Sequence, residues 1–263
     1  MYRFLTSPRW LVGHVVVLGV VVLFANLGLW QLRRLEQVRG HNALVAARLS
    51  SRPQPLQAVL GAAGGDPRAV VFRRATVSGR YLSDQELLLG PRSRDGRPGY
   101  HVLTPLETGD GRVLLVDRGW VPYELDEPPV RQAAPPDGQV RVSGILLQSP
   151  PPPRFAPQPP ARGRLDLVLR VDVSRLQAQF DPPLYPLYLQ LGDQVPAQPD
   201  LPLASVAPEL DEGNHFSYAV QWFLFAAVAL VGYAALLYRT AREQDADGPL
   251  APARVHEVAD RSS

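Results

Sequence analysis

Residues 10–30 read WLVGHVVVLGVVVLFANLGLW, a run of 21 residues that contains no Arg and no acidic side chain. As an α-helix this run would be about 31 Å long, which matches the hydrocarbon core of a bilayer. The alternative is a cleavable signal peptide, whose apolar region is usually about 7–15 residues long and precedes a cleavage site with small residues. Here the longer run leads into Gln31, Leu32, Arg33 and Arg34, so the sequence predicts an uncleaved anchor.

A second apolar run of the same length lies near the C-terminus. Residues 218–238 read YAVQWFLFAAVALVGYAALLY, without a charge and with aromatic residues at both ends, where the membrane interfaces would lie. A helix buried in a soluble core is the alternative for either run, but two charge-free runs of matched length argue against it. The sequence therefore predicts two transmembrane helices.

The orientation of these helices follows from the Arg residues near their ends. Arg239 and Arg242 follow the second run, whereas Asp211 and Glu212 precede it, so the C-terminal end is expected in the cytoplasm. Two spans place both termini on the same side of the cell membrane. The predicted order is a cytoplasmic N-terminus (1–9), a first transmembrane helix (10–32), an extracytoplasmic β-rich domain (33–213), a second transmembrane helix (214–238) and a disordered cytoplasmic tail (239–263).

The middle domain shows mainly strand patterns, with branched and aromatic residues in short runs that turn sequences such as Asp95-Gly96 and Asp137-Gly138 separate. The predicted strands are Val70 to Leu82, Glu86 to Leu89, Tyr100 to Leu106, Arg112 to Val121, Gln139 to Leu147, Leu165 to Val173 and Leu184 to Leu191. A short helix is expected from Val173 to Phe180, and Leu32 to Leu49 is expected to extend the first span as a polar helix. This pattern predicts a mainly antiparallel small barrel or sandwich with one or two short helices.

Two proline-rich stretches interrupt this pattern. Pro150 to Pro160 reads PPPPRFAPQPP, and it is predicted to be a loop because such a proline-rich sequence cannot form a central strand. Residues Val195 to Pro208 are expected to run as an extended strap that returns the chain to the membrane.

The composition excludes several classes of function. The chain has no Cys, so it has neither a disulfide framework nor thiolate chemistry. All 27 basic residues are Arg, which removes lysine chemistry, and a net charge of +2 does not favour a nucleic-acid partner. Neither a G-x-S-x-G elbow nor an H-E-x-x-H helix occurs. We therefore expect no enzymatic activity.

Imidazole is the main ligand type left for a metal or haem, and the chain has five His residues. His256 lies in the predicted tail and His41 on the polar helix extension, while His14 lies within the first span. His101 stands at the entry to a predicted strand. His215 directly precedes the second span, where it would either ligate an iron at the outer interface or act as a helix cap or interface residue.

Four segments resemble the Surfeit locus protein 1 family, the membrane assembly factors of haem-copper cytochrome c oxidase. They are Gly28 to Leu35 (GLWQLRRL), Gly96 to Leu106 (GRPGYHVLTPL), Val116 to Pro122 (VDRGWVP) and Asn214 to Ala226 (NHFSYAVQWFLFA). The likeness runs from the first span through the second. Each segment alone is short, but their order between two terminal spans makes the combination specific.

The resemblance implies a role in assembling the oxidase, with haem a bound and passed to its catalytic subunit. The family's haem-linked histidine matches His215, and its aromatic positions match Tyr218 and Trp222. His101 or a partner chain is the candidate for the second ligand. Asp117-Arg118 is expected to be a structural charge pair, or Arg118 holds a carboxylate or a haem propionate. Arg33, Arg34 and Arg97 are further candidates for a propionate.

The expected partners are the catalytic subunit, haem a synthase and the lipid bilayer. The alternative is a scaffold that stabilises an oxidase intermediate without binding haem, through the GRPGYH and DRGW segments.

Overall fold

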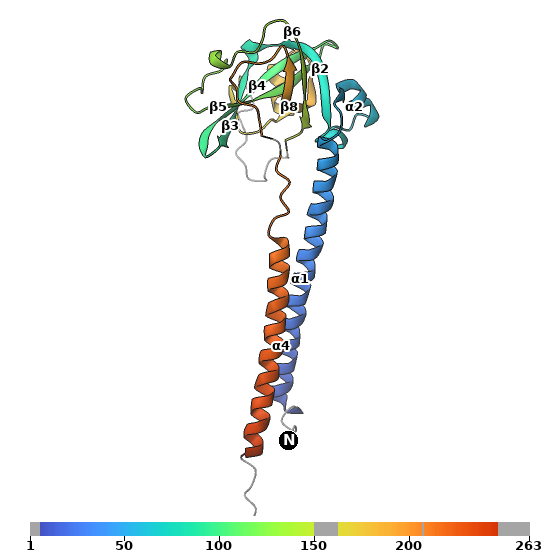
Figure 1. Ribbon diagram of the computed structural model, residues 1–263, viewed down its shortest axis with the longest axis vertical. Coiled ribbons are helices and arrows are strands. Elements are labelled where there is room, and N and C mark those ends of the chain that lie inside the picture. The colour runs from blue at the N-terminus through green and yellow to red at the C-terminus, as the bar shows by residue number, and fades with distance from the viewer. Residues whose placement is uncertain (1–5, 150–162, 207, 247–263) are drawn as a thin grey trace, which may run out of the picture. The chain divides into compact units, whose positions relative to one another are not determined.

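The computed structural model describes residues 6–149, 163–206 and 208–246. The chain forms two compact units, one made of Met1–Asn42 with Asp211–Ser263 and the other of Ala43–Leu210. We call them the helical unit and the sheet unit (Figure 1). The predicted loop Pro150 to Pro160 and most of the predicted tail, including His256, lie outside the described residues.

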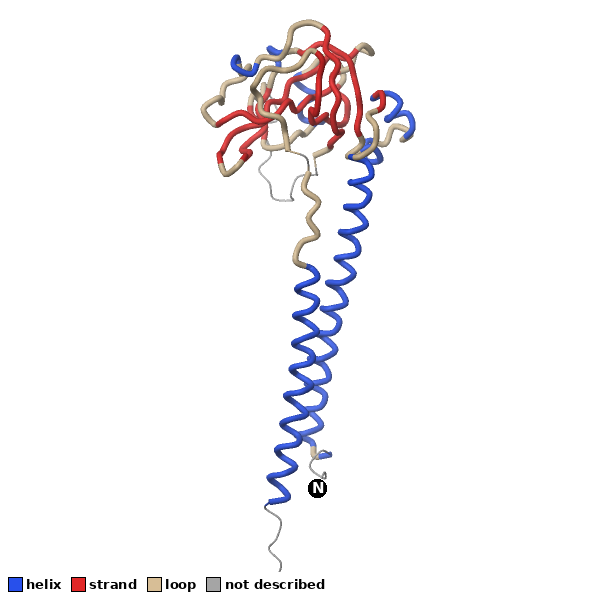
Figure 2. The backbone as a smooth tube through the Cα atoms, viewed as in Figure 1, coloured by secondary structure: helices blue, strands red, loops and turns tan. Residues whose placement is uncertain are grey.

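Two long helices dominate the helical unit, and they lie side by side in Figure 2. Helix α1 runs over Pro8–Leu49, which confirms the predicted polar extension of the first span. Helix α4 runs over His215–Ala246, so it continues past residue 238, where the tail was predicted to begin.

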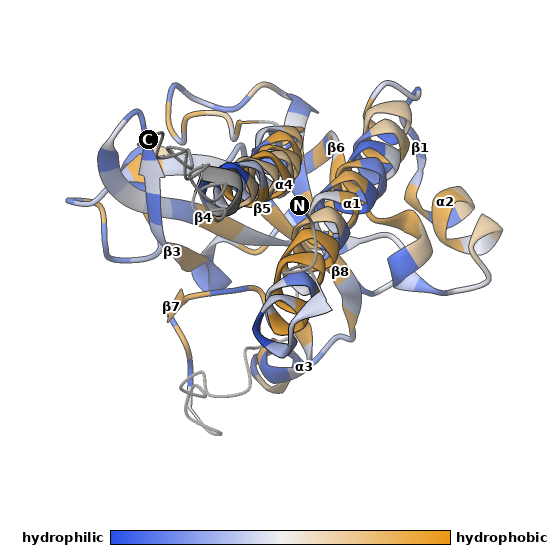
Figure 3. Cartoon of the chain, turned by 90° about the horizontal axis from the view of Figure 1, so that it is seen from below, coloured by the Kyte–Doolittle hydropathy of each residue, from blue (hydrophilic) through white to orange (hydrophobic). Residues whose placement is uncertain are grey.

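Both helices are long and apolar enough to cross a membrane, over Pro8–Leu49 and His215–Glu243. Figure 3 shows hydrophobic residues along both of them. Only 6% of the most apolar window of each helix is buried, so neither is the core helix of a soluble domain.

The two helices contact each other along one seam. The contacts are those of His14 with Tyr233, Phe24 with Trp222, Gly28 with Phe223, and Gln31 with His215. The α1 positions in this series are separated by steps of three, four and ten residues, which is the spacing of left-handed coiled-coil packing. Gly28 permits the closest approach, because a Cβ atom there would lie 2.8 Å from the Phe223 ring.

The sheet unit has one eight-stranded sheet with short helices around it. Its strands are β1 (Gln54–Pro55), β2 (Arg74–Tyr81), β3 (Leu87–Arg94), β4 (Arg97–Thr108), β5 (Val113–Pro122), β6 (Gln139–Leu147), β7 (Leu167–Val168) and β8 (Leu184–Val195). Its helices are α2 (Leu56–Ala62) and α3 (Val173–Leu176), with 3-10 turns η2 (Pro67–Val70), η3 (Ser83–Gln85), η4 (Arg131–Ala133) and η5 (Gln177–Gln179). All seven predicted strands have a counterpart: β6 has the predicted ends, β7 keeps only two residues of the predicted Leu165 to Val173, and the other strands have one or both ends shifted. Helix α3 with η5 covers the predicted short helix up to Gln179, and β1 and α2 were not predicted.

The sheet closes into a barrel. The strand order is β1-β2-β6-β8-β5-β4-β3-β7, and an additional pairing of Gly79–Tyr81 on β2 with residues 106–108 on β4 joins the ends of the ring β2-β6-β8-β5-β4. Of the two predicted architectures, the barrel is therefore the one that forms. Most pairings are antiparallel, as predicted, but β5 pairs with β8 in parallel.

The core of the barrel is built from side chains of alternate strand positions, because successive residues of a strand point to opposite faces. The largest cluster of buried side chains joins the barrel to α2, through residues such as Val59, Leu114, Val116 and Leu189. The residue that follows Leu114 and Val116 on the same face of β5 is Arg118. The apolar core therefore continues into a buried charge.

After β8 the chain returns as a strap across the end of β5. Leu203 forms an antiparallel bridge with Trp120, with N–H to O distances of 2.7 and 2.8 Å. Gly119 has a φ of +132°, and a Cβ atom there would lie 2.2 Å from the Leu203 carbonyl oxygen. This position thus needs Gly both for its backbone conformation and for the approach of the strap.

Candidate functional site

His215 is the first residue of α4, and a polar turn positions it. The preceding Gly213 has a φ of +67°, and its N–H donates to the Asp211 side chain over 2.9 Å. The Asn214 carbonyl accepts the first helical hydrogen bond, from the Tyr218 N–H over 3.0 Å. The turn therefore begins the helix so that the imidazole lies at the end of the predicted second span.

The Nδ1 atom of His215 lies 2.8 Å from Oε1 of Gln31, a buried side chain on α1. An amide oxygen only accepts hydrogen bonds, so Nδ1 of the imidazole donates, and in a neutral imidazole Nε2 then carries the lone pair. A Cβ atom at Gly213 would lie 3.7 Å from Nε2, and the Gly leaves this side of the ring uncrowded. This hydrogen bond fixes the tautomer in which Nε2 is available to a metal ion.

The two predicted aromatic residues follow His215 along α4. Tyr218 is 49% exposed, one turn beyond His215. Trp222 packs against Phe24 of α1, with ring centroids 5.6 Å apart, and lies edge-on to Phe225 at 5.9 Å. The structure therefore places an imidazole, an exposed phenol and an aromatic cluster along one end of the helix pair.

A second polar contact lies elsewhere in the same seam. The Tyr233 hydroxyl is 2.6 Å from Nδ1 of His14, and the two rings meet edge-on with centroids 5.6 Å apart. The imidazole of His14 therefore faces the other helix.

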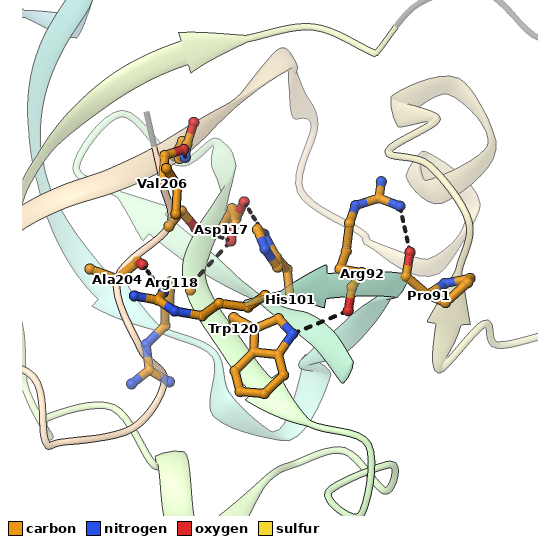
Figure 4. A network of polar contacts seen from close by, with 12 residues as sticks. Pro91, Arg92, His101, Asp117, Arg118, Trp120, Ala204 and Val206 are labelled. Carbon is orange, nitrogen blue, oxygen red and sulfur yellow. Dashed lines mark hydrogen bonds and ion pairs between the residues drawn. The ribbon is translucent and has the colours of Figure 1, made fainter. Parts of the chain in front are cut away.

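His101 lies in the sheet unit, on β4. Its Nδ1 atom is 2.9 Å from Oδ2 of Asp117 on β5, as Figure 4 shows. The other carboxylate oxygen of Asp117 accepts from the Gly119 N–H over 3.1 Å and from the Ser205 hydroxyl of the strap over 3.3 Å. Asp117 thus ties His101 to the strap.

Arg118 lies beside a carboxylate of the fold, which is one of the alternatives predicted for it. Its side chain is 0% exposed and lies in the barrel, so it presents no surface to a haem propionate. Its Nη1 atom donates to the Ala133 carbonyl over 2.7 Å and lies 3.6 Å from the Glu86 carboxylate. The guanidinium also lies over the Tyr81 ring, 5.5 Å from its centroid. The carboxylate that it meets is therefore internal to the fold.

The Glu86 carboxylate is buried with Arg118. It accepts hydrogen bonds from the Thr104 hydroxyl and the Val130 N–H, each over 2.8 Å. Burial raises the pKa of Glu86 even though these hydrogen bonds and Arg118 oppose the shift. Burial also lowers the pKa of Arg118. The pair is thus held in an environment that disfavours both charges.

The predicted site residues belong to the two different units of the chain. His215, Tyr218 and Trp222 lie on one helix of the helical unit, whereas His101 and Arg118 belong to the sheet unit. Sequence reasoning did not single out Gln31 or Glu86. Gln31 is part of the GLWQLRRL segment, so its position beside a span was a usable signal. Across the described residues 6–149, 163–206 and 208–246, no group of three or more His, Asp or Glu side chains is arranged to hold a metal ion.

Comparison with known proteins gives a consistent result. The SURF1 family model matches residues 18–227. An uncharacterised SURF1-like protein of Mycobacterium bovis is 29% identical over 254 residues, which cover 94% of this chain and 91% of that protein. SURF1-like proteins of Monosiga brevicollis and Rickettsia felis are 28% and 25% identical, covering 81% and 86% of this chain and 83% and 96% of their own lengths. The family match covers most of the sequence, from the first apolar helix into the second. The chain therefore belongs to the SURF1 family, the Surfeit locus protein 1 family that its four segments resemble.

Proposed function

We propose that this protein is an assembly factor for haem-copper cytochrome c oxidase that binds haem a through His215 and assists its insertion into the catalytic subunit. The SURF1 family is known for oxidase assembly, which supports an assembly role rather than an enzymatic one. The hydrogen bond between His215 and Gln31 is the observation that carries the haem-binding part.

The proposal places the protein in the cell membrane, with α1 and α4 as its spans and both termini in the cytoplasm. The length and apolar character of the two helices support this placement. So do Arg239 and Arg242 at the C-terminal end of α4, because Arg residues are enriched on the cytoplasmic side of spans. The sheet unit would then lie outside the cytoplasm.

The residues around His215 fit a haem. With Nδ1 bonded to Gln31, the Nε2 lone pair would hold the iron, in the arrangement by which histidine ligands are usually oriented. Tyr218 and Trp222 would contact the macrocycle with their rings. Haem a supplies the redox centre of the oxidase once it is inserted, and this chain would only bind, orient and release it.

The test is the haem content of the protein made together with haem a synthesis. Full-length protein purified in detergent should carry haem a, identified by the absorption spectrum of its pyridine haemochrome. His215→Ala should lose most of that haem, whereas His41→Ala, at an exposed position of α1, should keep it. Equal haem in all three proteins would remove His215 from the mechanism.

A scaffold that stabilises an oxidase intermediate without haem is the second candidate. Of its predicted contact segments, DRGW is internal, since Arg118 and Trp120 are 0% and 3% exposed. The GRPGYH segment has exposed residues, among them Arg97, next to the tip of the β3–β4 hairpin. Tyr123 is also exposed and stacks on Tyr100 of that segment, with centroids 5.3 Å apart.

The two functions are separated by variants of these exposed residues. A scaffold predicts that Arg97→Ala with Tyr123→Ala reduces oxidase levels while His215→Ala does not. The tagged protein and its variants are then purified, and each is tested for co-purification of the catalytic subunit and of haem a synthase. This comparison identifies the partner that each variant no longer binds. Unchanged oxidase in the Arg97 and Tyr123 variants would count against the scaffold.

A further inference from the structure

A pocket of about 380 Å³ lies in the sheet unit, where α1 ends and β2 begins. Its lining residues are Leu44, Ala47, Arg48, Ser51, Arg52, Gln54, Val59, Arg73 and Arg74. They come from the last turns of α1, the turn after it, α2 and the first strand of the barrel. This volume is within the range of small-molecule sites.

Four of the lining residues are Arg, and the described residues of the lining include neither Asp nor Glu. Within residues 6–149, 163–206 and 208–246, none of these four guanidinium groups forms an ion pair with a carboxylate. Arg48 instead donates to the Val71 carbonyl over 2.6 Å. Other Arg residues of the sheet unit do pair, for example Arg80 with Glu107 and Arg170 with Asp172. The pocket therefore concentrates positive charge that the surrounding protein leaves uncompensated.

The remaining lining adds an apolar component. Leu44, Ala47 and Val59 contribute apolar side chains, and Val59 is itself buried in the core. The alkyl parts of Arg side chains also pack against apolar groups while the guanidinium stays in water. The pocket thus combines an apolar wall with several guanidinium groups, whose geometry suits the oxygens of a carboxylate or phosphate.

We infer that this pocket binds an organic anion, a carboxylate or phosphate group carried on an apolar body. The anionic group of this ligand pairs with guanidinium groups of the pocket, and its apolar body fills the space beside Leu44 and Val59. The site is separate from His215, and it stands whether or not the protein binds haem.

The proposed ligand is a molecule dissolved in the aqueous phase, not the headgroup of a membrane lipid. Arg48 lies 16 residues beyond Leu32, the predicted end of the first span, which is about 24 Å along the helix. The headgroup layer of one leaflet is only about 5–8 Å thick, and a helix tilt of about 40° would shorten 24 Å to about 18 Å. Measured along α1, the lipid headgroups of the same bilayer therefore end well before Arg48.

The test is calorimetric titration of the full-length protein in neutral phosphatidylcholine nanodiscs. Phenyl phosphate has both features of the ligand, inorganic phosphate has only the anion, and phenol has only the ring. We expect phenyl phosphate to bind most tightly and phenol not to bind. Arg52→Gln and Arg73→Gln should each weaken binding by about tenfold, the effect of losing one charge-assisted hydrogen bond. Arg131→Gln, an exposed Arg outside the pocket, should leave it unchanged.

Several results would overturn the inference. One is that phenyl phosphate does not bind, and another is that phenol binds as tightly as phenyl phosphate. A third is that the Arg131 variant loses as much affinity for phenyl phosphate as the Arg52 and Arg73 variants do. Thermal unfolding of each variant verifies that it is folded before titration. A last experiment repeats the titration in nanodiscs that contain phosphatidylglycerol. An unchanged affinity for phenyl phosphate supports an aqueous ligand. If phosphatidylglycerol weakens phenyl phosphate binding, and Arg52→Gln removes this competition, the pocket binds a lipid headgroup and the aqueous source is wrong.

Discussion

The His215 imidazole and the Gln31 side-chain amide form a hydrogen bond of 2.8 Å between α4 and α1. Gln31 is buried in this contact, while the far side of the imidazole borders Gly213. One helix thus supplies the candidate ligand and the other supplies the group that orients it. Groups that hydrogen-bond to a histidine ligand set its orientation and its basicity.

The first prediction concerns this orienting group. Gln31→Leu removes the acceptor, so the affinity for haem a should fall by about 10–100-fold, the usual effect of losing such a partner. Gln31→Glu keeps an acceptor and makes it negative, so it should retain binding and lower the midpoint potential of the bound haem. Haem titration followed by absorbance, and a spectroelectrochemical titration, measure the two effects.

Gln37→Leu is the control for Gln31, because Gln37 is an exposed amide on the same helix. If Gln31→Leu binds haem as the unchanged protein does, the hydrogen bond does not orient a ligand. Gln31 would then have no role in positioning His215, even if haem binding still required His215 itself.

The second prediction concerns the pair His14 and Tyr233, which lie 2.6 Å apart within the seam. Tyr233→Phe removes the hydroxyl and keeps the ring. Hydrogen bonds between transmembrane helices contribute about 0.6 kcal/mol on average and up to about 1.7 kcal/mol, so the helix pair should lose stability of that order. Unfolding in an SDS titration, followed by tryptophan fluorescence, measures the change.

The matched control is Tyr238→Phe, at an exposed Tyr of the same helix whose ring lies under Arg242. It should unfold at the same SDS fraction as the unchanged protein. Equal behaviour of the two Phe variants would show that the contact with His14 contributes nothing to helix pairing.

The third prediction concerns the strap. Gly119→Ala adds a Cβ atom that would lie 2.2 Å from the Leu203 carbonyl oxygen. It also puts an Ala on a backbone with a φ of +132°, which side chains rarely adopt. The bridge between Leu203 and Trp120 should break, and the sheet unit should lose about 2–4 kcal/mol of stability. Hydrogen exchange of the peptide that contains Leu203 should accelerate.

Gly111→Ala separates the two causes of this effect. Gly111 has a φ of +74°, and its added Cβ would meet no atom within 4 Å. Gly111→Ala should lower the free energy of unfolding by about 1 kcal/mol through backbone strain alone, and the strap should stay protected from hydrogen exchange. Slow exchange at Leu203 in Gly119→Ala would contradict the steric account.

The strands were predictable because their patterns are local. Alternating branched and aromatic residues predicted all the strands of the ring β2-β6-β8-β5-β4. Closure of the ring was not predictable, since it depends on the pairing of Tyr81 with Leu106, which are distant in sequence. Nothing in either run alone distinguishes a barrel from a sandwich.

The candidate site divides in the same way. The position of His215 before an apolar run marked it as a candidate without any structure. Gln31 was missed because its role depends on the register between α1 and α4. The alternatives for Arg118, a carboxylate of the fold or a haem propionate, stayed open because a single strand does not show which of its faces is internal. Its partner, Glu86, reaches it only through the barrel topology.

The fourth prediction concerns the buried pair Glu86 and Arg118. Glu86→Ala leaves the Arg118 guanidinium buried without its carboxylate, and removing one partner of a buried pair usually costs about 3–5 kcal/mol. The double variant Glu86→Leu with Arg118→Met should recover most of that loss, because it removes both buried charges. Chemical denaturation of the full chain, measured for Glu86→Leu, Arg118→Met and the double variant, gives the coupling free energy. Additive losses would show that the two groups do not act as a pair.

The fifth prediction concerns the pH dependence that Glu86 contributes. Burial raises its folded-state pKa above the ordinary value, so between the unfolded and folded pKa values the folded chain binds more protons. The contribution of Glu86 to stability is therefore fully present below the unfolded pKa, about 4.3, and is lost as the pH rises through the folded pKa.

Glu86→Gln tests this pH dependence, because its side chain cannot ionise. The free energy of unfolding of the unchanged protein, minus that of Glu86→Gln, should fall as the pH rises from about 4 and become constant above the folded pKa. Glu124→Gln, at an exposed carboxylate, should show no such fall. A difference that rises with pH would mean that Arg118 and the hydrogen bonds from Thr104 and Val130 outweigh burial, and that the folded barrel favours the ionised pair.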